Sequence, residues 1–337
     1  MDLRRRRPDA QSGRAGSVVS TRPRILLTRR WPDAVEQRLA ASYDVTFNQS
    51  DQPMDAAALA QAMRYHDALC PTVTDRVTRD VLLTDGRRAR IIANYGAGYE
   101  HIDLGAAREA GLVVTNTPDV LTEATADIAL TLMLMAMRRA GEGERELRAG
   151  NWSGWRPTHL LGQSLDGKLL GLVGFGRIAR AVAKRAEVFG MRIAYHSRRP
   201  ADDMPASAYF ADLGALAEQA DVLSLHAPGG AETRHMIDTA LLARMPGHAV
   251  LVNTGRGSLI DEGALAQALA ERRIAAAGLD VYEGEPQVHP ALVALPNVIL
   301  LPHLGSATIE ARTAMGMKVA DNLDRFFAGA SLLDPVA

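Results

Sequence analysis

The sequence has little that would tie the protein to a special environment: one cysteine, few aromatic residues and almost no net charge. Cys70 is the only cysteine among 337 residues, so the chain cannot form an internal disulfide or a metal site built from several thiolates. This usage fits a reducing cytoplasm. The formal net charge of −1 gives no general attraction to nucleic acid or to an anionic membrane. Any anion that binds must therefore be held by a local site.

Long hydrophobic runs are also missing. The longest nearly apolar run, IALTLMLMAM at 128–137, is too short to cross a bilayer and is typical of a buried helix. Residues 1–22 are rich in arginine but have no apolar stretch after it, so they do not have the pattern of a signal peptide. We predict that they form a disordered basic tail, and we expect neither nucleic acid nor a membrane as a partner.

What the chain does have is a regular alternation of short apolar runs and helical patterns. Before residue 118 the apolar runs are RILLTRR, YDVTFN, DALCPT, RIIANYG and LVVTNTP, which is typical of a parallel sheet with crossover helices. A second series suits a nucleotide-binding doubly wound sheet: KLLGLVGFG, MRIAYHS, DVLSLHAP, AVLVNTG, AAGLDVY and VILLPH. The length favours two domains. A last amphipathic helical pattern follows residue 305, and we expect it to cross back onto the first unit.

A glycine loop lies between the first strand and the first helix of the second series. Gly174, Gly176 and Ala179 form the G-x-G-x-x-G/A arrangement that lets a pyrophosphate approach the backbone at a helix N-terminus. The strand–loop–helix context makes this short motif specific. We predict a dinucleotide site that includes Phe175, Arg177 and Ile178 as well as the two glycines.

The end of the next strand lacks the carboxylate that usually binds the ribose hydroxyls. Ser197 stands there, followed by Arg198 and Arg199. Guanidinium groups match the geometry of a phosphate, and a carboxylate would repel a 2′-phosphate. The sequence therefore favours NADP(H), with NAD(H) as the alternative.

Three later strands of the second series each end in polar residues, at the edge of the sheet where doubly wound folds bind ligands. Arg256 lies between two glycines, the stretch GLDVYEGEP offers the carboxylates Asp280, Glu283 and Glu285, and His303 follows a proline. An arginine can bind a substrate carboxylate or carbonyl oxygen, and a carboxylate beside His303 would stabilise the protonated ring. This set can carry out acid–base chemistry without a metal.

These motifs together resemble the D-isomer-specific 2-hydroxyacid dehydrogenase family. The resemblance covers about residues 24–330 and rests on YGAGYEHID, GLVGFGRIA, NTGRGSLIDEGAL, GLDVYEGEP and LPHLGSAT. Within the family the chain is most similar to NADP-dependent glyoxylate/hydroxypyruvate reductases, through ILLTRRWPDAVEQRL, TEATADIAL, GWRPTHLLG and HSRR. The implied fold class is α/β with two doubly wound parallel-sheet domains. A Rossmann coenzyme domain (118–301) would be inserted in a flavodoxin-like substrate domain made of 23–117 and 302–337.

The resemblance also implies roles for particular residues. Arg256 would bind the 2-oxo acid and polarise its carbonyl, His303 would be the acid/base, and Glu285 would be its partner. The family uses the carboxylate immediately before the proline, so Glu283 is set aside. The backbone amides of Ala97 and Gly98 would bind the substrate carboxylate.

Further residues would contact the cofactor by the same resemblance. Asp280 and Thr125 are expected on the nicotinamide side, and the chain has PGG where the family often has PLT, which leaves the adenine contacts open. The remaining predicted cofactor contacts are His226, Pro228, Thr233 and Thr254.

The implied activity is NADPH-dependent reduction of a small 2-oxo acid to the D-2-hydroxy acid, in a cytoplasmic homodimer. Trp152 and Trp155 resemble an aromatic segment that reaches the partner's active site in related reductases, with simple interface packing as the alternative. Other members of the family remain as alternatives: 2-ketogluconate reductase, phenylpyruvate reductase, formate dehydrogenase and phosphoglycerate dehydrogenase. A dinucleotide-sensing scaffold protein is the alternative from a different class.

Overall fold

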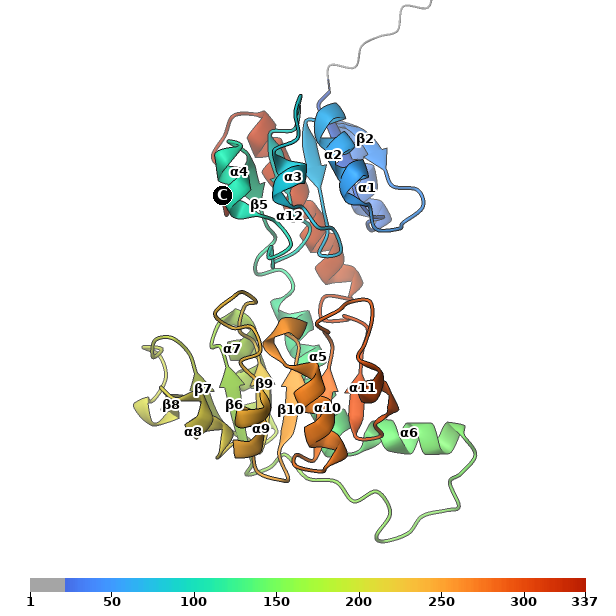
Figure 1. Ribbon diagram of the computed structural model, residues 1–337, viewed down its shortest axis with the longest axis vertical. Helices are drawn as coiled ribbons and strands as arrows, with labels where there is room; N and C mark the ends of the chain where they lie inside the picture. The colour runs from blue at the N-terminus through green and yellow to red at the C-terminus, as the bar shows by residue number, and fades with distance from the viewer. Residues whose placement is uncertain (1–21) are drawn as a thin grey trace, which may run out of the picture.

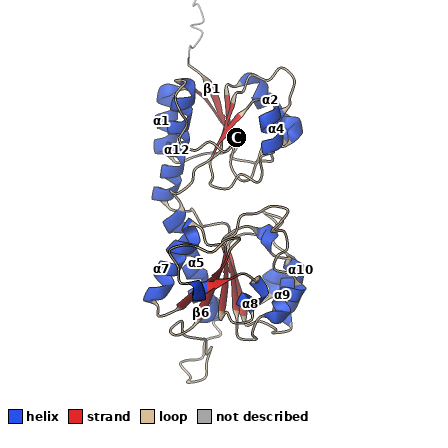
Figure 2. Ribbon diagram, turned by 90° about the vertical axis from the view of Figure 1, so that its left-hand side faces the viewer, coloured by secondary structure: helices blue, strands red, loops and turns tan. Residues whose placement is uncertain are grey.

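Two parallel β-sheets, each covered by helices on both faces, make up the part of the chain that the computed structural model describes, residues 22–337 (Figure 1; Figure 2). Apart from Arg22, the predicted basic tail lies outside these residues. Within them, no helix combines the length and the apolar character that a membrane span requires.

The first sheet has five parallel strands in the order β2-β1-β3-β4-β5, the flavodoxin-like order. The strands are β1 (Arg24–Leu27), β2 (Asp44–Phe47), β3 (Ala68–Cys70), β4 (Ile91–Ala93) and β5 (Val113–Thr115). The helices that connect them are α1 (Asp33–Ser42), α2 (Ala56–Tyr65), α3 (Arg79–Leu82) and α4 (Leu104–Glu109). The apolar residues of the inner strands β1, β3 and β4 are buried, as expected for a parallel sheet covered on both faces, whereas the edge strand β2 alternates exposed and half-buried residues.

The second sheet has seven parallel strands in the order β12-β11-β10-β9-β6-β7-β8, so strand order reverses between β6 and β9. The strands are β6 (Leu169–Val173), β7 (Arg192–His196), β8 (Tyr209–Phe210), β9 (Val222–Leu225), β10 (Val250–Asn253), β11 (Ala276–Leu279) and β12 (Val298–Leu300). The helices are α5 (Thr122–Met137), α6 (Ala140–Arg148), α7 (Arg177–Val188), α8 (Leu213–Ala217), α9 (Thr239–Arg244), α10 (Glu262–Ala270) and α11 (Pro290–Ala294), with 3₁₀ turns η1 (Ala206–Ala208) and η2 (Gly257–Leu259). This is the Rossmann arrangement with one added strand.

The last helix, α12 (Ile309–Phe327), returns to the first sheet and packs on α1 (Figure 2). Gly316 makes the close approach possible, because a Cβ at this position would lie 2.5 Å from a methyl carbon of Val35. On the same helix Met315, Val319 and Leu323 join the core of the first unit. The first unit is therefore completed by the end of the chain, and the predicted fold class is confirmed.

The long helical pattern after residue 121 is interrupted, which the sequence alone does not reveal. Helix α5 ends at Met137, Arg139 has a left-handed φ of 52°, and α6 begins at Ala140. The carbonyl of Met137 accepts a hydrogen bond from the amide of Gln163, 2.8 Å away. The segment after α6 therefore caps the end of α5, and a tertiary contact ends the helix.

Candidate functional site

Loops at the carboxyl ends of the strands form a groove on the second unit, with a volume of about 1220 Å³. Gly174 has φ 83°, and a Cβ there would lie 2.8 Å from the backbone nitrogen of Ala227, so only glycine fits. Gly176 is different, since a Cβ there would meet nothing within 4 Å and would point into open space. It is also the N-cap of α7, whose first N–H groups are available to an anion.

The far end of the groove carries two arginines that have no partner. Arg198 and Arg199 are exposed, and no hydrogen bond or ion pair within residues 22–337 involves their guanidinium groups. The hydroxyl of Ser197 donates to the carbonyl of Arg199 at 2.6 Å and so fixes this turn. Either arginine can pair with a phosphate that enters this end of the groove.

One further arginine lines the same groove and was not predicted. The guanidinium of Arg180 lies 4.6 Å from the centre of the Phe175 ring and pairs with Asp203. Phe175 in turn stacks on Tyr195 at 4.2 Å. The sequence contains no clear signal for Arg180, because its place in the groove depends on its contacts with Phe175 and Asp203.

A cleft of about 1050 Å³ lies between the loops of the two sheets and is continuous with the groove. His226, Ala227, Pro228 and Gly229 line both cavities and so form their boundary. The cleft brings together all the residues predicted for catalysis and substrate binding: Ala97, Gly98, Arg256, Glu285 and His303.

The imidazole of His303 is held by a carboxylate at one of its two nitrogens. Its Nδ1 lies 2.9 Å from Oε2 of Glu285, and the other oxygen of Glu285 accepts from the amide of Tyr282 at 3.0 Å. Burial disfavours the charged form of Glu285, but the hydrogen bond and charge of His303 outweigh it and lower the pKa of Glu285. The carboxylate is thus anionic at neutral pH and leaves Nε2 of His303 as the free nitrogen.

The turn that carries His303 is tied to a buried carboxylate. The two oxygens of Asp280 accept from the amides of Leu304 and Gly305, at 2.6 and 2.8 Å. The amide of His303, whose φ is 55°, donates to the backbone carbonyl of Asp280. Burial raises the pKa of Asp280, although these amides oppose it. Asp280 therefore offsets the cost of the left-handed turn.

The conformation of the loop that carries Arg256 depends on neighbouring glycines and on an asparagine. A Cβ on Gly257 would lie 1.9 Å from the backbone carbon of Tyr282, so this loop packs directly on the segment that carries Glu285. The amide group of Asn253 donates to the carbonyl of Arg256 at 2.9 Å and accepts from Gly255 at 3.0 Å. The backbone of Arg256 is fixed relative to the histidine pair.

On the opposite wall of the cleft, Asn94 organises a backbone nest formed by residues 96–98. Its side-chain nitrogen donates to the carbonyls of Gly96 and Gly98, at 3.0 and 2.9 Å, and its oxygen lies 3.0 Å from Nε2 of His101. Burial lowers the pKa of His101 to about 4, so the ring is neutral and donates through Nε2. No hydrogen bond within the described residues uses the amides of Ala97 or Gly98. These two amides remain available to an anion.

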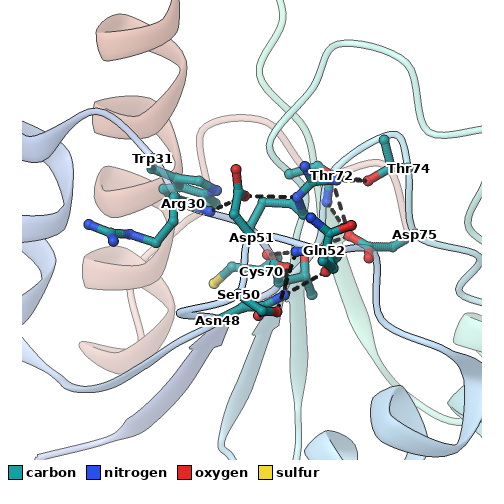
Figure 3. A network of polar contacts seen from close by, with 12 residues as sticks. Arg30, Trp31, Asn48, Ser50, Asp51, Gln52, Cys70, Thr72, Thr74 and Asp75 are labelled. Atoms are coloured by element: carbon teal, nitrogen blue, oxygen red, sulfur yellow. Dashed lines mark hydrogen bonds and ion pairs between the residues drawn. The ribbon is translucent and has the colours of Figure 1, made fainter. Parts of the chain in front are cut away.

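The roof of the cleft consists of three loops joined by polar contacts, shown in Figure 3. The amide of Arg30 donates to Asp51 at 3.0 Å, and the side chain of Asn48 donates to the carbonyl of Gln52 at 2.7 Å. The amide of Thr72 donates to Asp75 at 2.8 Å. The bond of Arg30 to Asp51 joins the segments after β1 and β2, and Nη1 of Arg29 donates to the hydroxyl of Thr74 at 3.3 Å, which joins the segment after β3 to the same wall.

Not every predicted cofactor contact lies in the groove. Phe175, Ser197 and Thr233 line the groove, whereas Ile178, Thr125, Thr254 and Asp280 line the cleft. Arg177 lines neither cavity and pairs with Asp119 at 2.7 Å. Thr125 donates to the carbonyl of Gly305 at 3.1 Å, and the buried hydroxyl of Thr254 has no partner within residues 22–337.

Comparisons with known proteins agree with these motifs. A family model described as D-isomer specific 2-hydroxyacid dehydrogenase, NAD binding domain, matches residues 130–305. A glyoxylate reductase of Thermococcus litoralis is 43% identical over 314 residues, which cover 91% of this chain and 95% of that protein. A glycerate dehydrogenase of Hyphomicrobium methylovorum is 38% identical, over 93% of this chain and 98% of its own. The solved structure of NADPH-dependent glyoxylate/hydroxypyruvate reductase from Sinorhizobium meliloti, in complex with NADP and malonate, is 40% identical with a TM-score of 0.85 and covers 94% and 97% of the two chains.

Proposed function

The chain belongs to the D-isomer specific 2-hydroxyacid dehydrogenase family, and from this premise we propose that it reduces a small 2-oxo acid of the glyoxylate/hydroxypyruvate type to the D-2-hydroxy acid with NADPH. The family predicted from the motifs is confirmed, and the chain is an NAD(P)-dependent oxidoreductase. The observation that carries the proposal is the Glu285–His303 pair, which shares one cleft with Arg256 and opens onto the groove of the glycine loop.

The groove fits a dinucleotide by its own features. Gly176 leaves open space at the N-terminus of α7, where a pyrophosphate would bind, and Arg198 and Arg199 lie free at the opposite end. Together these features support NADP(H) as the preferred cofactor, with NAD(H) as the alternative. When bound, NADPH supplies the hydride for the carbonyl carbon of the substrate. Asp280 and Thr125 line the cleft beside the turn that carries His303 and would face the nicotinamide.

The residues of the cleft bind the substrate and transfer the proton. The free amides of Ala97 and Gly98 bind the substrate carboxylate, and Arg256 binds the substrate and stabilises the negative charge that develops on its carbonyl oxygen. His303 donates the proton from Nε2 to this oxygen, because Glu285 holds Nδ1. Glu285 stabilises the protonated ring and fixes its orientation.

The two units would have separate tasks. We assign residues 23–117 and 302–337 to the substrate domain and residues 118–301 to the coenzyme domain. This division is supported by the return of α12 to the first sheet and by the position of the cleft between the two sheets. Movement of one unit towards the other would exclude water from the reacting atoms.

We also propose that the enzyme is a cytoplasmic homodimer. Trp155 and Trp152 are 81% and 51% exposed, on the extended segment after α6 (Figure 1). Large aromatic side chains that project from one unit are typical of a subunit interface. Light scattering that gives the mass of a monomer at micromolar concentration would contradict the dimer.

The function is tested by following NADPH and NADH oxidation by absorbance across a panel of 2-oxo acids. We expect turnover with glyoxylate and hydroxypyruvate, and a lower KM for NADPH than for NADH. The panel includes 2-ketogluconate, phenylpyruvate and phosphohydroxypyruvate, which represent the other members of the family. If one of these three is reduced with a higher kcat/KM than glyoxylate and hydroxypyruvate, the substrate assignment is wrong.

A further inference from the structure

Arg256 already has a carboxylate on its guanidinium, and that carboxylate belongs to the protein. Its Nε and Nη2 donate to Oε2 of Glu100, at 3.1 and 3.2 Å, and its Nη1 donates to the carbonyl of Gly255 at 2.7 Å. Glu100 follows β4 of the first sheet, whereas Arg256 follows β10 of the second. The ion pair therefore joins opposite walls of the cleft.

The pair lies on the backbone nest. A Cβ added to Gly98 would lie 1.5 Å from Nη2 of Arg256 and 2.7 Å from Oε2 of Glu100. The guanidinium thus rests directly against the glycine whose amide is free. This is the place where the proposed function puts the carboxylate of the substrate.

Because of these contacts, few N–H groups of the Arg256 guanidinium remain available to an incoming anion. A carboxylate binds arginine most strongly through two parallel N–H groups on one edge. One such edge, Nε and Nη2, is taken by a single oxygen of Glu100. An incoming carboxylate that binds along this edge must displace Glu100.

We propose that Glu100 is an internal competitor of the substrate, which holds Arg256 in the empty cleft and is displaced when a 2-oxo acid binds. This inference rests on the proposed function, since it deepens the role of Arg256. An anion that contacts only the guanidinium would replace one ion pair with another and gain little. A 2-oxo acid gains the amides of Ala97 and Gly98 as well, so the competition selects for it.

The partial exposure of the Arg256–Glu100 ion pair is compatible with a contact that must break when the substrate binds. The side chains of Arg256 and Glu100 are 33% and 34% exposed. Ion pairs in such surroundings change an equilibrium by only about two- to fivefold. Glu100 can therefore be displaced at a cost that the additional contacts of the substrate offset.

The test uses Glu100→Gln, which keeps the shape of the side chain and removes its charge. A matched control is Glu109→Gln, because Glu109 also forms an arginine pair on the first unit, with Arg79 at 2.7 Å, but lies outside the cleft. The readouts are the KM for glyoxylate at saturating NADPH and, by isothermal titration calorimetry, the Kd of the NADP-loaded protein for oxalate. We expect both constants to fall about two- to fivefold in Glu100→Gln and to stay unchanged in Glu109→Gln.

Several results would overturn the inference. A KM and a Kd that are unchanged or higher in Glu100→Gln would mean that Glu100 does not compete, and an equal fall in the control would mean a general effect of charge. Absence of oxalate binding by both the parent protein and Glu100→Gln would also overturn it, because Arg256 would then not bind a carboxylate. If Glu100→Gln does not fold, Glu100→Asp, with its shorter reach, must change both constants in the same direction.

Failure of the proposed function would look different. If the unmodified protein oxidises no NADPH with either glyoxylate or hydroxypyruvate but binds oxalate, the reaction is wrong and the oxalate titration alone decides on Glu100. If it oxidises NADPH and the variant shows no fall in either constant, the reaction stands and the role of Glu100 is wrong.

Discussion

His303 is central to the proposed chemistry because its two ring nitrogens have different neighbours. Nδ1 faces Glu285 at 2.9 Å, while Nε2 has no partner within residues 22–337. We predict that His303→Ala lowers kcat with hydroxypyruvate at least about a hundredfold, the usual contribution of a positioned acid. Steady-state NADPH oxidation measures it.

The control for this prediction is His248→Ala. His248 also lies 2.8 Å from a carboxylate, Asp221, but on the surface and outside both cavities. Its kcat should stay close to that of the unmodified protein. A kcat of His303→Ala that remains within a few-fold of the parent would remove His303 from the mechanism.

We propose that the preference for NADPH depends on Arg198 and Arg199, whose guanidinium groups have no partner within residues 22–337. We predict that Arg198→Ala raises the KM for NADPH about tenfold or more and leaves the KM for NADH nearly unchanged, because one charge-assisted bond to the 2′-phosphate is lost. Arg76→Ala removes another exposed arginine, which does not line the groove, and should change neither constant. An equal change for both cofactors in Arg198→Ala would contradict the 2′-phosphate site.

The sequence predicts well those functional residues whose neighbours along the chain form a motif. Their positions at strand ends predict Arg256 and His303, the family motif selects Glu285 among three carboxylates, and the structure brings all three residues into one cleft. Glu100 and Asn94 were not assigned a role, because their importance comes from side chains that lie far away in the sequence or from carbonyl groups of their own loop. Such contacts leave no periodic pattern.

The glycine loop before α7 shows how one element serves the fold with one residue and the ligand with another. Gly174 has a left-handed φ and touches the backbone of Ala227, whereas a side chain on Gly176 would meet only open space. We predict that Gly174→Ala lowers the melting temperature by several degrees, as a loss of about 1–2 kcal/mol would.

Gly176→Val should instead leave the melting temperature of the free protein nearly unchanged but abolish NADPH binding, because its side chain fills the space for the pyrophosphate. Differential scanning fluorimetry with and without NADPH measures both effects. If Gly176→Val is stabilised by NADPH as much as the parent, the loop does not hold the cofactor.

The sequence predicts strands and their order of appearance better than it predicts where helices end. All the apolar runs of the two series become strands, because their β-rich composition and their flanking turn residues agree, and among these strands only the edge strand β2 has no buried residue. The break between α5 and α6 at Arg139 is set by the contact of Gln163 with Met137, which no local pattern contains.

The stability of the whole molecule should decrease in mild acid because of buried histidines. Burial lowers the pKa of His66, and it lowers the pKa of His101 and of His226 to about 4. In the unfolded chain these rings titrate near 6.5. Between pH 6.5 and 4 the unfolded state therefore binds more protons than the folded state, so the free energy of unfolding falls as the pH falls.

We predict a lower urea midpoint at pH 5.0 than at pH 7.5. The difference between the two midpoints should be smaller in His66→Gln, which removes one of the three histidine rings, at a position outside the cleft. Urea unfolding followed by circular dichroism measures both midpoints. A midpoint that is equal at the two pH values, or a difference that His66→Gln leaves unchanged, would contradict this account.

In the proposed reaction a hydride moves from NADPH to the carbonyl carbon of a 2-oxo acid in this cleft and forms the D-2-hydroxy acid. The most direct measurement is the reduction of hydroxypyruvate with NADPH that carries deuterium at the transferable C4 position, followed by NMR and chiral analysis of the product. We expect D-glycerate that carries deuterium at C2. L-glycerate, glycerate without deuterium at C2, or no reduced product would contradict it.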